Sequence, residues 1–235
     1  MNWQDKFLNK IVCGDCIEVM KGLPDNCVDI TITSPPYNLG DKHHTGNKNH
    51  KPYPDSMPED DYQEWQIKVL DEIYRVTKSD GSLFYNHKNR IRDGVSIIPY
   101  QWLFKSKWLI KQEIVWRNGG QNFDRIRFFP QTERIYWLVK DAKTKLFNPI
   151  SLLDYWYLSP VGTKKEHTRQ FPEKLVENIL CCLENSKIIL DPFSGRGTTP
   201  VVAKKLGRHY IGVDISPEYV NMSNDRLGQT EKPLF

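Results

Sequence analysis

The sequence predicts an α/β fold in which a mostly parallel β-sheet is covered by helices on both faces. Short runs of aliphatic and β-branched residues at 28–32 and 188–190 have the length and composition of buried strands. Segments with apolar residues at three- and four-residue spacing, such as 60–77, lie between such runs. This alternation is typical of a parallel sheet, because parallel strands need a crossover connection.

In the first half of the chain, apolar runs and turn residues define three strands and three helices. Pro58-Glu59-Asp60 gives the longest helix an acidic beginning, and Asp80-Gly81 ends it before the next strand. Residues 39–58 form a polar loop without apolar periodicity, and a loop of this length is usually functional or mobile. The predicted strands are 10–13, 28–32 and 82–86, and the predicted helices are 16–21, 60–77 and 94–105.

The second half begins with two longer strands that suit an antiparallel pair and ends with regular strand–helix alternation. Irregular chain is expected over 140–166, between the two halves of this pattern. The predicted strands are 108–116, 133–139, 188–190 and 210–213, and the predicted helices are 172–184, 199–207 and 217–227.

The length of the chain is enough for one large α/β domain or two small ones. The chain has 235 residues, 39% of them hydrophobic, and no apolar segment approaches bilayer length. Residues 1–6 lack the layout of a signal peptide, so we expect a cytoplasmic protein. The net charge of +4 permits nucleic-acid binding without arguing for it. Cys13 and Cys16 have no second pair at zinc-like spacing, so reduced thiols are favoured over a zinc or redox site and no metal is expected.

The strand at 28–32 stops at T-S-P-P-Y-N, residues 33–38. Proline has a fixed φ and pushes the preceding residue into an extended conformation, so Ser34, Pro35, Pro36 and Tyr37 are held in one preset arrangement. Ligands of open α/β sheets bind at this carboxyl end of the strands. A hydroxyl, a free carbonyl and an aromatic ring suit a planar ligand with an amino group, such as a nucleobase.

A second motif, D-P-F-S-G-R-G-T-T, spans residues 191–199, and the following strand closes on Asp214. Glycines let a ligand approach the backbone, a helix amino end offers N–H groups, and an acid can hold ribose hydroxyls. The loop lacks the third glycine of a dinucleotide fingerprint and the Gly-Lys-Ser/Thr of a phosphate loop. Asp191 is also unfavourable to a pyrophosphate. The motif therefore favours a cationic or zwitterionic ligand with an adenosine moiety.

Together the two motifs resemble those of the S-adenosylmethionine-dependent DNA methyltransferases that modify exocyclic amino groups (N4 of cytosine or N6 of adenine). The catalytic motif precedes the cofactor motif, as in the permuted beta group, and segments 14–16, 81–84 and 167–175 match the family in the same order. The resemblance implies a Rossmann-like class I methyltransferase fold with a seven-stranded, mostly parallel sheet and circularly permuted motif order. It implies a single catalytic domain over 1–235, with 39–58 as a mobile DNA-facing loop and 140–166 as a short target-recognition insertion.

The same resemblance implies S-adenosylmethionine as the cofactor. Residues of the second motif would line its methionine half, Asp214 would hydrogen-bond the ribose, and Asp15 would lie near the adenine amino group. Asp15 could instead only cap the helix at 16–21, and Phe193 could be plain core. The implied cofactor residues are Asp15, Thr168, Gln170, Pro172, Asp191, Pro192, Phe193, Gly195, Gly197, Thr198 and Asp214.

The catalytic turn suggests how an exocyclic amino group could be activated. Its lone pair is delocalised into the base, and two acceptors that draw it toward tetrahedral geometry would localise it; Ser34 Oγ and the Pro35 carbonyl suit this role. Tyr37 would stack on a base that has left the helix. Neutral serine is a weak base, so we assign it no outright proton removal. In the family, Ser at this position goes more often with cytosine N4 and Asp with adenine N6, so cytosine is favoured and adenine is the alternative.

The expected partner is double-stranded DNA. Basic residues in 42–51 and 117–127 are candidates for phosphate contacts, although charged runs are more often solvated surface. A catalytically inactive methyltransferase-like protein and an RNA methyltransferase are further alternatives. The sequence leaves open the recognition site, a homodimer, and a separate cognate restriction endonuclease.

Overall fold

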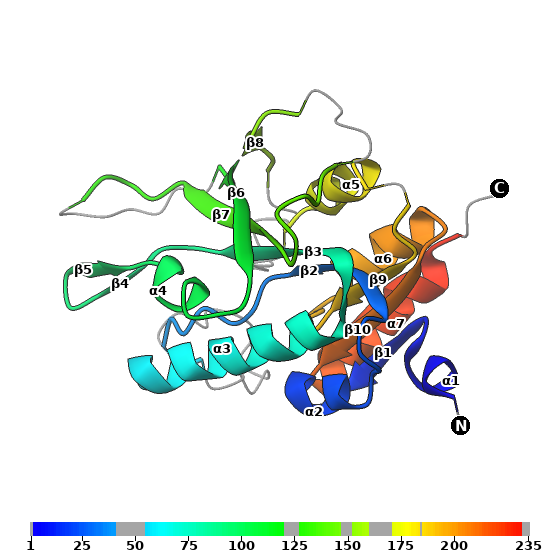
Figure 1. The fold of residues 1–235 in the computed structure, drawn as a ribbon. Helices are drawn as coiled ribbons and strands as arrows, with labels where there is room; N and C mark the ends of the chain where they lie inside the picture. The colour runs from blue at the N-terminus through cyan, green and yellow to red at the C-terminus, as the bar shows by residue number, and fades with distance from the viewer. Residues whose placement is uncertain are drawn as a thin grey trace.

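The computed structural model describes residues 2–40, 55–119, 127–146, 152–159, 171–183 and 185–231. Its centre is an eight-stranded sheet in the order β1-β10-β9-β2-β3-β7-β6-β8 (Figure 1). Five of its strands, β1, β10, β9, β2 and β3, run parallel to one another, and β7 is antiparallel to both β3 and β6. The predicted class, an α/β fold with a mostly parallel sheet, is confirmed.

The strands of this sheet are β1 (Lys10–Cys13), β2 (Val28–Thr33), β3 (Thr77–His87), β6 (Leu109–Arg117), β7 (Thr132–Val139), β8 (Tyr155–Tyr157), β9 (Ile188–Asp191) and β10 (His209–Asp214). A separate hairpin is formed by β4 (Arg90–Arg92) and β5 (Val95–Ile97). The helices are α1 (Trp3–Phe7), α2 (Cys16–Lys21), α3 (Glu59–Val76), α4 (Tyr100–Leu103), α5 (Glu173–Cys181), α6 (Thr198–Lys205) and α7 (Pro217–Gln229).

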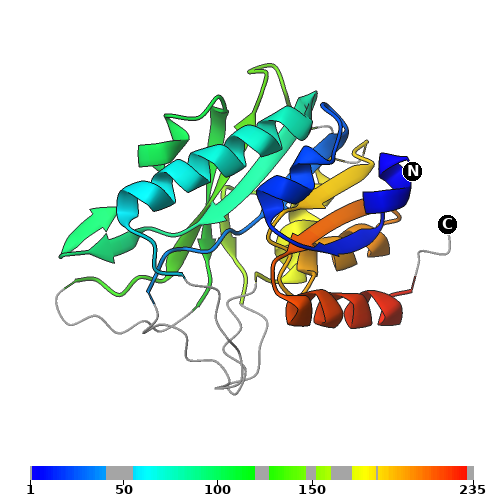
Figure 2. The same ribbon diagram turned by 90° about the horizontal axis from the view of Figure 1, so that it is seen from below.

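Two hydrophobic clusters cover the two faces of the sheet. One cluster contains Val176 of α5, Val202 of α6 and Leu227 of α7. The other contains Met20 of α2 and Val69 of α3. Figure 2 shows α3 and α7 on opposite sides of the strands. The central strand β2 is therefore buried along nearly its whole length, which explains why its residues other than the half-buried Asp29 are all β-branched.

The strand order brings the two sequence motifs together. β2 and β9 are neighbours that pair in parallel, with Thr31 opposite Leu190. The strand that follows β2 in the chain, β3, lies on one side of this pair, and the strand that follows β9, β10, lies on the other side. Ligands of open α/β sheets bind where neighbouring strands diverge in this way. The turn after β2 and the loop after β9, about 160 residues apart in the sequence, therefore begin at the same edge of the sheet.

The structure corrects the prediction of a helix over 94–105. Asp93 and Gly94 both have positive φ, 51° and 79°, and join β4 to β5 as a two-residue hairpin turn. An Asp-Gly pair between short apolar runs favours such a hairpin, and only Tyr100–Leu103 of the predicted helix is helical.

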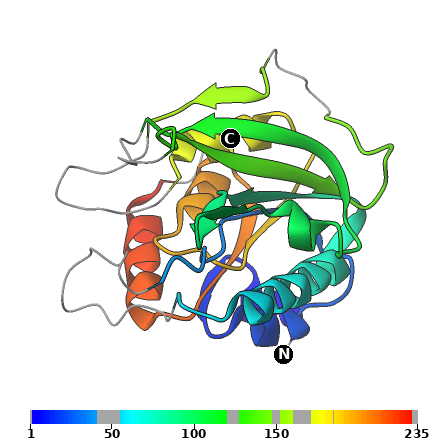
Figure 3. The same ribbon diagram turned by 90° about the vertical axis from the view of Figure 1, so that its left-hand side faces the viewer.

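The sheet also has one strand more than the expected seven. β8, with the buried Trp156, pairs in parallel with β6 inside the segment expected to be irregular. Figure 3 shows β6 and β7, in green, continuing the sheet beyond β3. In the part of the chain that the structure describes, no helix is long and apolar enough to cross a bilayer.

Candidate functional site

The first half of the site is the turn that leaves β2. Ser34 Oγ lies 2.7 Å from Tyr37 Oη, and the Tyr62 hydroxyl of α3 donates to the Pro36 carbonyl at 2.7 Å. No described residue donates a hydrogen bond to the Pro35 carbonyl. The double proline thus has one carbonyl that accepts a hydrogen bond and one without a donor among the described residues, and the catalytic role of Pro35 stays a prediction.

Two residues that sequence reasoning missed complete this half of the site. Asn86 Nδ2 lies 3.3 Å from Ser34 Oγ, 2.7 Å from Tyr37 Oη and 3.0 Å from Glu133 Oε2. Tyr37 also donates to Glu133 Oε2, at 3.0 Å. Asn86 stands at the end of β3 and Glu133 near the beginning of β7, and antiparallel pairing places these two ends at the same edge. The predicted strand at 133–139 begins at Glu133, but its antiparallel pairing was expected with 108–116, so no sequence signal placed Glu133 beside the catalytic turn.

The side-chain oxygen of the buried Asn86 is an unused hydrogen-bond acceptor. Its Oδ1 has no hydrogen-bond partner among the described residues, although the residue is only 3% exposed. Buried polar atoms are nearly always paired in folded proteins. An unpaired acceptor next to Ser34 therefore suits a ligand that brings N–H groups.

Behind the turn, His87 packs against the Tyr37 ring at a centroid distance of 4.5 Å. Burial lowers the pKa of His87 to about 3, so its imidazole is neutral at neutral pH. Its Nε2 lies 2.8 Å from the Tyr62 hydroxyl, and Gln66 Nε2 donates to that hydroxyl at 2.8 Å. This network holds the Tyr37 ring in place, and Lys88 Nζ lies over the same ring, 5.8 Å from its centroid.

The exit of the turn is fixed by side chains on both sides of residues 41–54. The Asn38 side chain donates to the Met57 carbonyl at 2.9 Å and accepts from the Met57 N–H at 2.7 Å. Asp55 accepts hydrogen bonds from the backbone N–H groups of Asn38 and Leu39. The positive φ of Asn38, 54°, is therefore held by the chain that leads into α3.

The second half of the site is the loop that leaves β9, and a direct hydrogen bond connects it to the first. Thr33 Oγ1, at the last position of β2, donates to Asp191 Oδ1 at 2.7 Å. The Phe193 N–H donates to the same oxygen at 3.1 Å. Asp191 is 2% exposed, and burial raises its pKa to about 6. The buried Asp191 carboxylate therefore connects the two motifs. Its contact with the cofactor stays a prediction.

The glycines of this loop have the conformations that the motif requires. Gly195 has a φ of +51° with open space where a Cβ would stand, so a ligand can approach its backbone. Gly197 has a φ of +77°, and a Cβ there would lie 2.9 Å from Ser223 Oγ. Ser194 Oγ is buried without a hydrogen-bond partner among the described residues. The loop thus offers accessible backbone and an unused hydroxyl.

Asp214 and Asp15 follow two neighbouring strands at this edge. The half-buried Asp214 accepts from the Gly195 N–H at 2.9 Å and from the Ser216 N–H at 2.8 Å, and burial raises its pKa. Cys13, two residues before Asp15, pairs with Asp214 across β1 and β10. Asp15 caps α2 by accepting from the Ile17 and Glu18 N–H groups. Capping uses Oδ1, so the structure is compatible with both roles considered for Asp15.

Of the remaining predicted cofactor residues, some lie in or near the glycine loop, and others lie outside the described residues. Phe193 is half-buried, and its ring lies 5.6 Å from that of Trp65, so the contact connects the glycine loop to α3. Pro192 and Thr198 are buried in the loop and at the first position of α6, and Pro172 is the buried N-cap of α5. Thr168 and Gln170 lie outside the described residues.

These groups fit an adenosine-containing cofactor with a positive charge. Two carboxylates at the loop disfavour phosphate, whereas the open space beside Gly195, the unpaired Ser194 hydroxyl and the half-buried Phe193 ring suit a neutral or cationic ligand. Asp214 at the end of β10 has the position from which an acid holds ribose hydroxyls in nucleotide-binding folds.

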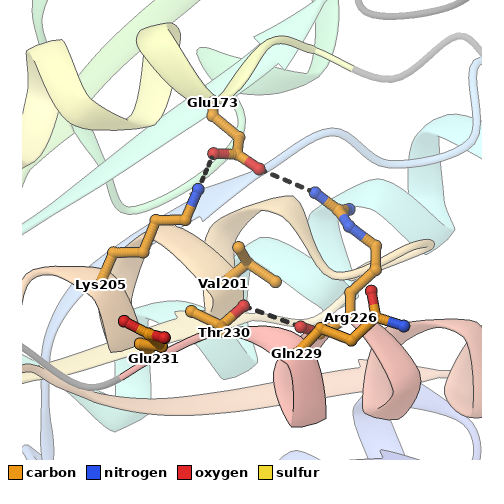
Figure 4. Close-up of a pocket in the computed structure, with 7 residues that line it drawn as sticks. All are labelled: Glu173, Val201, Lys205, Arg226, Gln229, Thr230 and Glu231. Carbon is orange, nitrogen blue, oxygen red and sulfur yellow. Dashed lines mark hydrogen bonds and ion pairs between the residues drawn. The ribbon is translucent and has the colours of Figure 1, made fainter.

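An open pocket of about 360 Å³ lies elsewhere, between α5, α6 and α7 (Figure 4). Glu173 forms ion pairs there with Lys205 at 2.5 Å and with Arg226 at 3.0 Å. Arg226 also donates to the Arg196 carbonyl at 2.6 Å. The pocket contains none of the predicted catalytic groups, and we interpret its charges as a structural connection between α5 and the glycine loop.

The cysteines give no competing site. Burial raises the pKa of Cys16 to about 12, so it stays a thiol at neutral pH, whereas Cys13 is exposed. Within the described ranges, no group of three or more His, Cys, Asp and Glu side chains is arranged to hold a metal ion.

The sequence of this chain is similar to that of a family of DNA methylases and to type II methyltransferases. Residues 28–225 match the N6_N4_Mtase family, described as DNA methylase. Type II methyltransferase M.BglII of Bacillus subtilis is 31% identical over 93% of this chain and 68% of its own, and Type II methyltransferase M.ScaI of Streptomyces caespitosus is 29% identical over 94% and 82%.

Solved structures share the fold. PvuII DNA methyltransferase (cytosine-N4-specific) has a TM-score of 0.77 at 21% identity and covers 92% of this chain and 85% of its own. The M1.HpyAVI–SAM complex has a TM-score of 0.60 at 24% identity, covering 93% and 98%.

Proposed function

The chain belongs to the N6_N4_Mtase family of DNA methylases, and on that premise we propose that it transfers a methyl group from S-adenosylmethionine to the exocyclic N4 amino group of cytosine in DNA. The observation that carries the proposal is the contact between Thr33 and Asp191. In support, this contact joins the turn that carries Ser34 and Pro35 to the glycine loop, so a target amino group and a methyl donor would meet at one edge of the sheet.

When bound, S-adenosylmethionine supplies an electrophilic methyl group on a sulfonium. The chain's own residues hold the amino group that attacks it. Ser34 Oγ and the Pro35 carbonyl accept its two N–H groups and draw the nitrogen toward tetrahedral geometry, which localises the lone pair. Such preorganised positioning and electrostatics supply most of the rate enhancement in this type of reaction.

The Tyr37 ring completes the site for the base. The ring is held by its contact with His87, and a base that leaves the helix stacks on it. Stacking of a base on an aromatic side chain contributes about 1–3 kcal/mol and tolerates different sequences.

On the cofactor side, Asp214, Gly195 and Phe193 are the residues with the most suitable geometry. Gly195 presents its backbone, Phe193 a half-buried ring, and Asp214 a carboxylate for the ribose. Asp15 and the residues around Pro172 would close the adenine end.

Cytosine is proposed over adenine because a serine stands at the first position of the catalytic turn. Ser34 is a neutral acceptor, and the resemblance to the family associates Ser with cytosine N4 and Asp with adenine N6. Adenine N6 is the alternative, since both amino groups are planar and can be held by the same two acceptors.

We further propose that the whole chain is a single catalytic domain acting on double-stranded DNA as the modification part of a restriction–modification system. The candidate phosphate-binding residues between 42 and 51, and those between 120 and 126, lie outside the described residues. The exposed Tyr155 and Tyr157 flank the buried Trp156 in the 140–166 segment, which makes this segment a candidate surface for target recognition.

The test is to methylate mixed-sequence double-stranded DNA with labelled S-adenosylmethionine and to identify the labelled nucleoside by mass spectrometry. N4-methylcytosine is expected, with most of the product lost in Ser34→Ala. N6-methyladenine as the sole product would overturn the proposed base, and transfer only to RNA would overturn the proposed substrate. Cofactor binding without transfer to any nucleic acid would indicate a non-catalytic relative.

A further inference from the structure

The hydroxyl of Tyr37 connects the catalytic Ser34 to the carboxylate of Glu133 by two hydrogen bonds. Glu133 Oε2 is 3.0 Å from Tyr37 Oη and 3.0 Å from Asn86 Nδ2, and Asn118 Nδ2 donates to Oε1 at 3.4 Å. Glu133 comes from β7, far in sequence from the catalytic turn, and the activation of the amino group described above does not use it.

The hydrogen bonds around this carboxylate have only one consistent direction. An ionised carboxylate accepts and never donates, so the Tyr37 hydroxyl gives its single proton to Glu133. Tyr37 Oη then accepts from the Ser34 hydroxyl, 2.7 Å away. The Ser34 hydroxyl proton is therefore used in the hydrogen bond to Tyr37, and Ser34 Oγ acts as a hydrogen-bond acceptor toward a bound ligand.

We propose that Glu133 is a positioning residue that polarises Ser34 through Tyr37 and takes up, along this chain of hydroxyls, the proton that the methylated amino group must lose. The inference rests on the proposed methyl transfer and supplies what that proposal lacks, namely a base. Serine alone is too weak to fill this role, whereas a carboxylate two hydrogen bonds away can do so.

The proton transfer balances in atoms and charge. When the nitrogen forms its bond to the methyl group it becomes positively charged, and one of its N–H bonds breaks as Ser34 Oγ accepts the proton. Ser34 passes its former proton to Tyr37 Oη, and Tyr37 passes its own to Glu133 Oε2. The products are a neutral methylated amine and a neutral carboxylic acid, which then loses its proton to solvent.

The surroundings of Tyr37 suit a residue that passes a proton on without storing a charge. Tyr37 is 9% exposed, and burial, followed by the nearby Glu133 carboxylate, raises its pKa well above the ordinary value. Tyrosinate is therefore not a stable end point. Asn86 donates to Tyr37 Oη and keeps the oxygen oriented between its two partners.

The experiment compares Glu133→Gln with a matched control, Glu113→Gln. In the Glu133→Gln variant the new amide would still accept from Tyr37 but cannot take up a proton, so a single-turnover rate on the order of 100-fold below wild type is expected, as for loss of a general base. The dissociation constants for DNA and S-adenosylmethionine should stay within about twofold. Glu113 on β6 accepts from the Tyr100 hydroxyl at 2.8 Å in the same way but away from Ser34, and its variant should keep the wild-type rate.

A double-mutant cycle with Tyr37→Phe separates this chain of hydroxyls from two independent effects. Tyr37→Phe keeps the ring and removes the connecting hydroxyl, so its rate and that of the double variant should both match Glu133→Gln. It also tests the inference if Glu133→Gln does not fold.

Two results would overturn the inference. One is a Glu133→Gln rate near that of the wild type, and the other is multiplication of the two single effects in the double variant. Absence of any methylated base from the wild-type enzyme would instead refute the proposed function, so the two failures are distinguishable.

Discussion

Replacing Thr33 by valine tests the hydrogen bond that joins the two motifs. Thr33 is fully buried and Asp191 is 2% exposed, so solvent cannot replace the lost hydroxyl. A hydrogen bond to a charged group contributes about 1.5–3 kcal/mol, and one between neutral groups about 0.5–1.5 kcal/mol. The loss of stability in Thr33→Val should therefore depend on whether Asp191 is ionised.

The sign of the pH dependence follows from the pKa of Asp191, which burial raises from 3.8 to about 6. Because the folded state binds this proton more tightly than the unfolded state, the stabilisation from protonation is fully present below pH 3.8 and is lost as the pH rises through 6. At pH values above 6 the folded carboxylate is ionised and needs the Thr33 hydroxyl most. We expect Thr33→Val to lower the free energy of unfolding by about 2–3 kcal/mol at about pH 8 and by about 1 kcal/mol at about pH 5.

The measurement is urea unfolding of wild type and variant at both pH values, followed by tryptophan fluorescence. Thr31→Val is the matched control, because Thr31 is equally buried on β2 but its hydroxyl has no hydrogen-bond partner among the described residues. Its replacement should be neutral or stabilising at both pH values. An equal loss for Thr33→Val at the two pH values, or an equal loss for Thr31→Val, would refute the reasoning.

Three further predictions concern the two halves of the site. Ser34→Ala should abolish most methyl transfer while the dissociation constant for S-adenosylmethionine, measured by calorimetry, stays unchanged; wild-type turnover would contradict its role. Asp214→Ala should weaken cofactor binding roughly tenfold or more, the value of one charged hydrogen bond, and an unaffected dissociation constant would remove its ribose contact. Gly197→Ala should lower stability by roughly 2 kcal/mol, because its φ is +77° and a Cβ would meet Ser223. The control Gly228→Ala, in open space on α7, should be neutral or stabilise by up to about 1 kcal/mol in the same unfolding assay.

Local patterns were sufficient for most of the elements. The strands β1, β2, β6, β7, β9 and β10 and the long helix α3 lie close to their predicted bounds, since each has a clear apolar period and turn residues at its ends. The failures were several short elements and the beginning of β3, which starts at Thr77 and includes the Asp80-Gly81 pair that was expected to precede the strand. The Asp93-Gly94 hairpin begins where a helix was expected, and β8 consists of three residues whose pairing with β6 no local pattern reveals.

By itself, the sequence determined which residue types stand in the catalytic turn and in the glycine loop, because proline and glycine set backbone geometry locally. The sequence did not determine which side chains are hydrogen-bonded to Ser34 and Tyr37. Asn86 reaches Ser34 only because β3 pairs in parallel with β2, and Glu133 reaches Tyr37 only because β7 pairs antiparallel with β3. Asp191 meets Thr33 only because β9 pairs with β2. Such contacts depend on strand order and register, which arise from packing of the whole sheet between its helices, and no stretch of sequence carries that information alone.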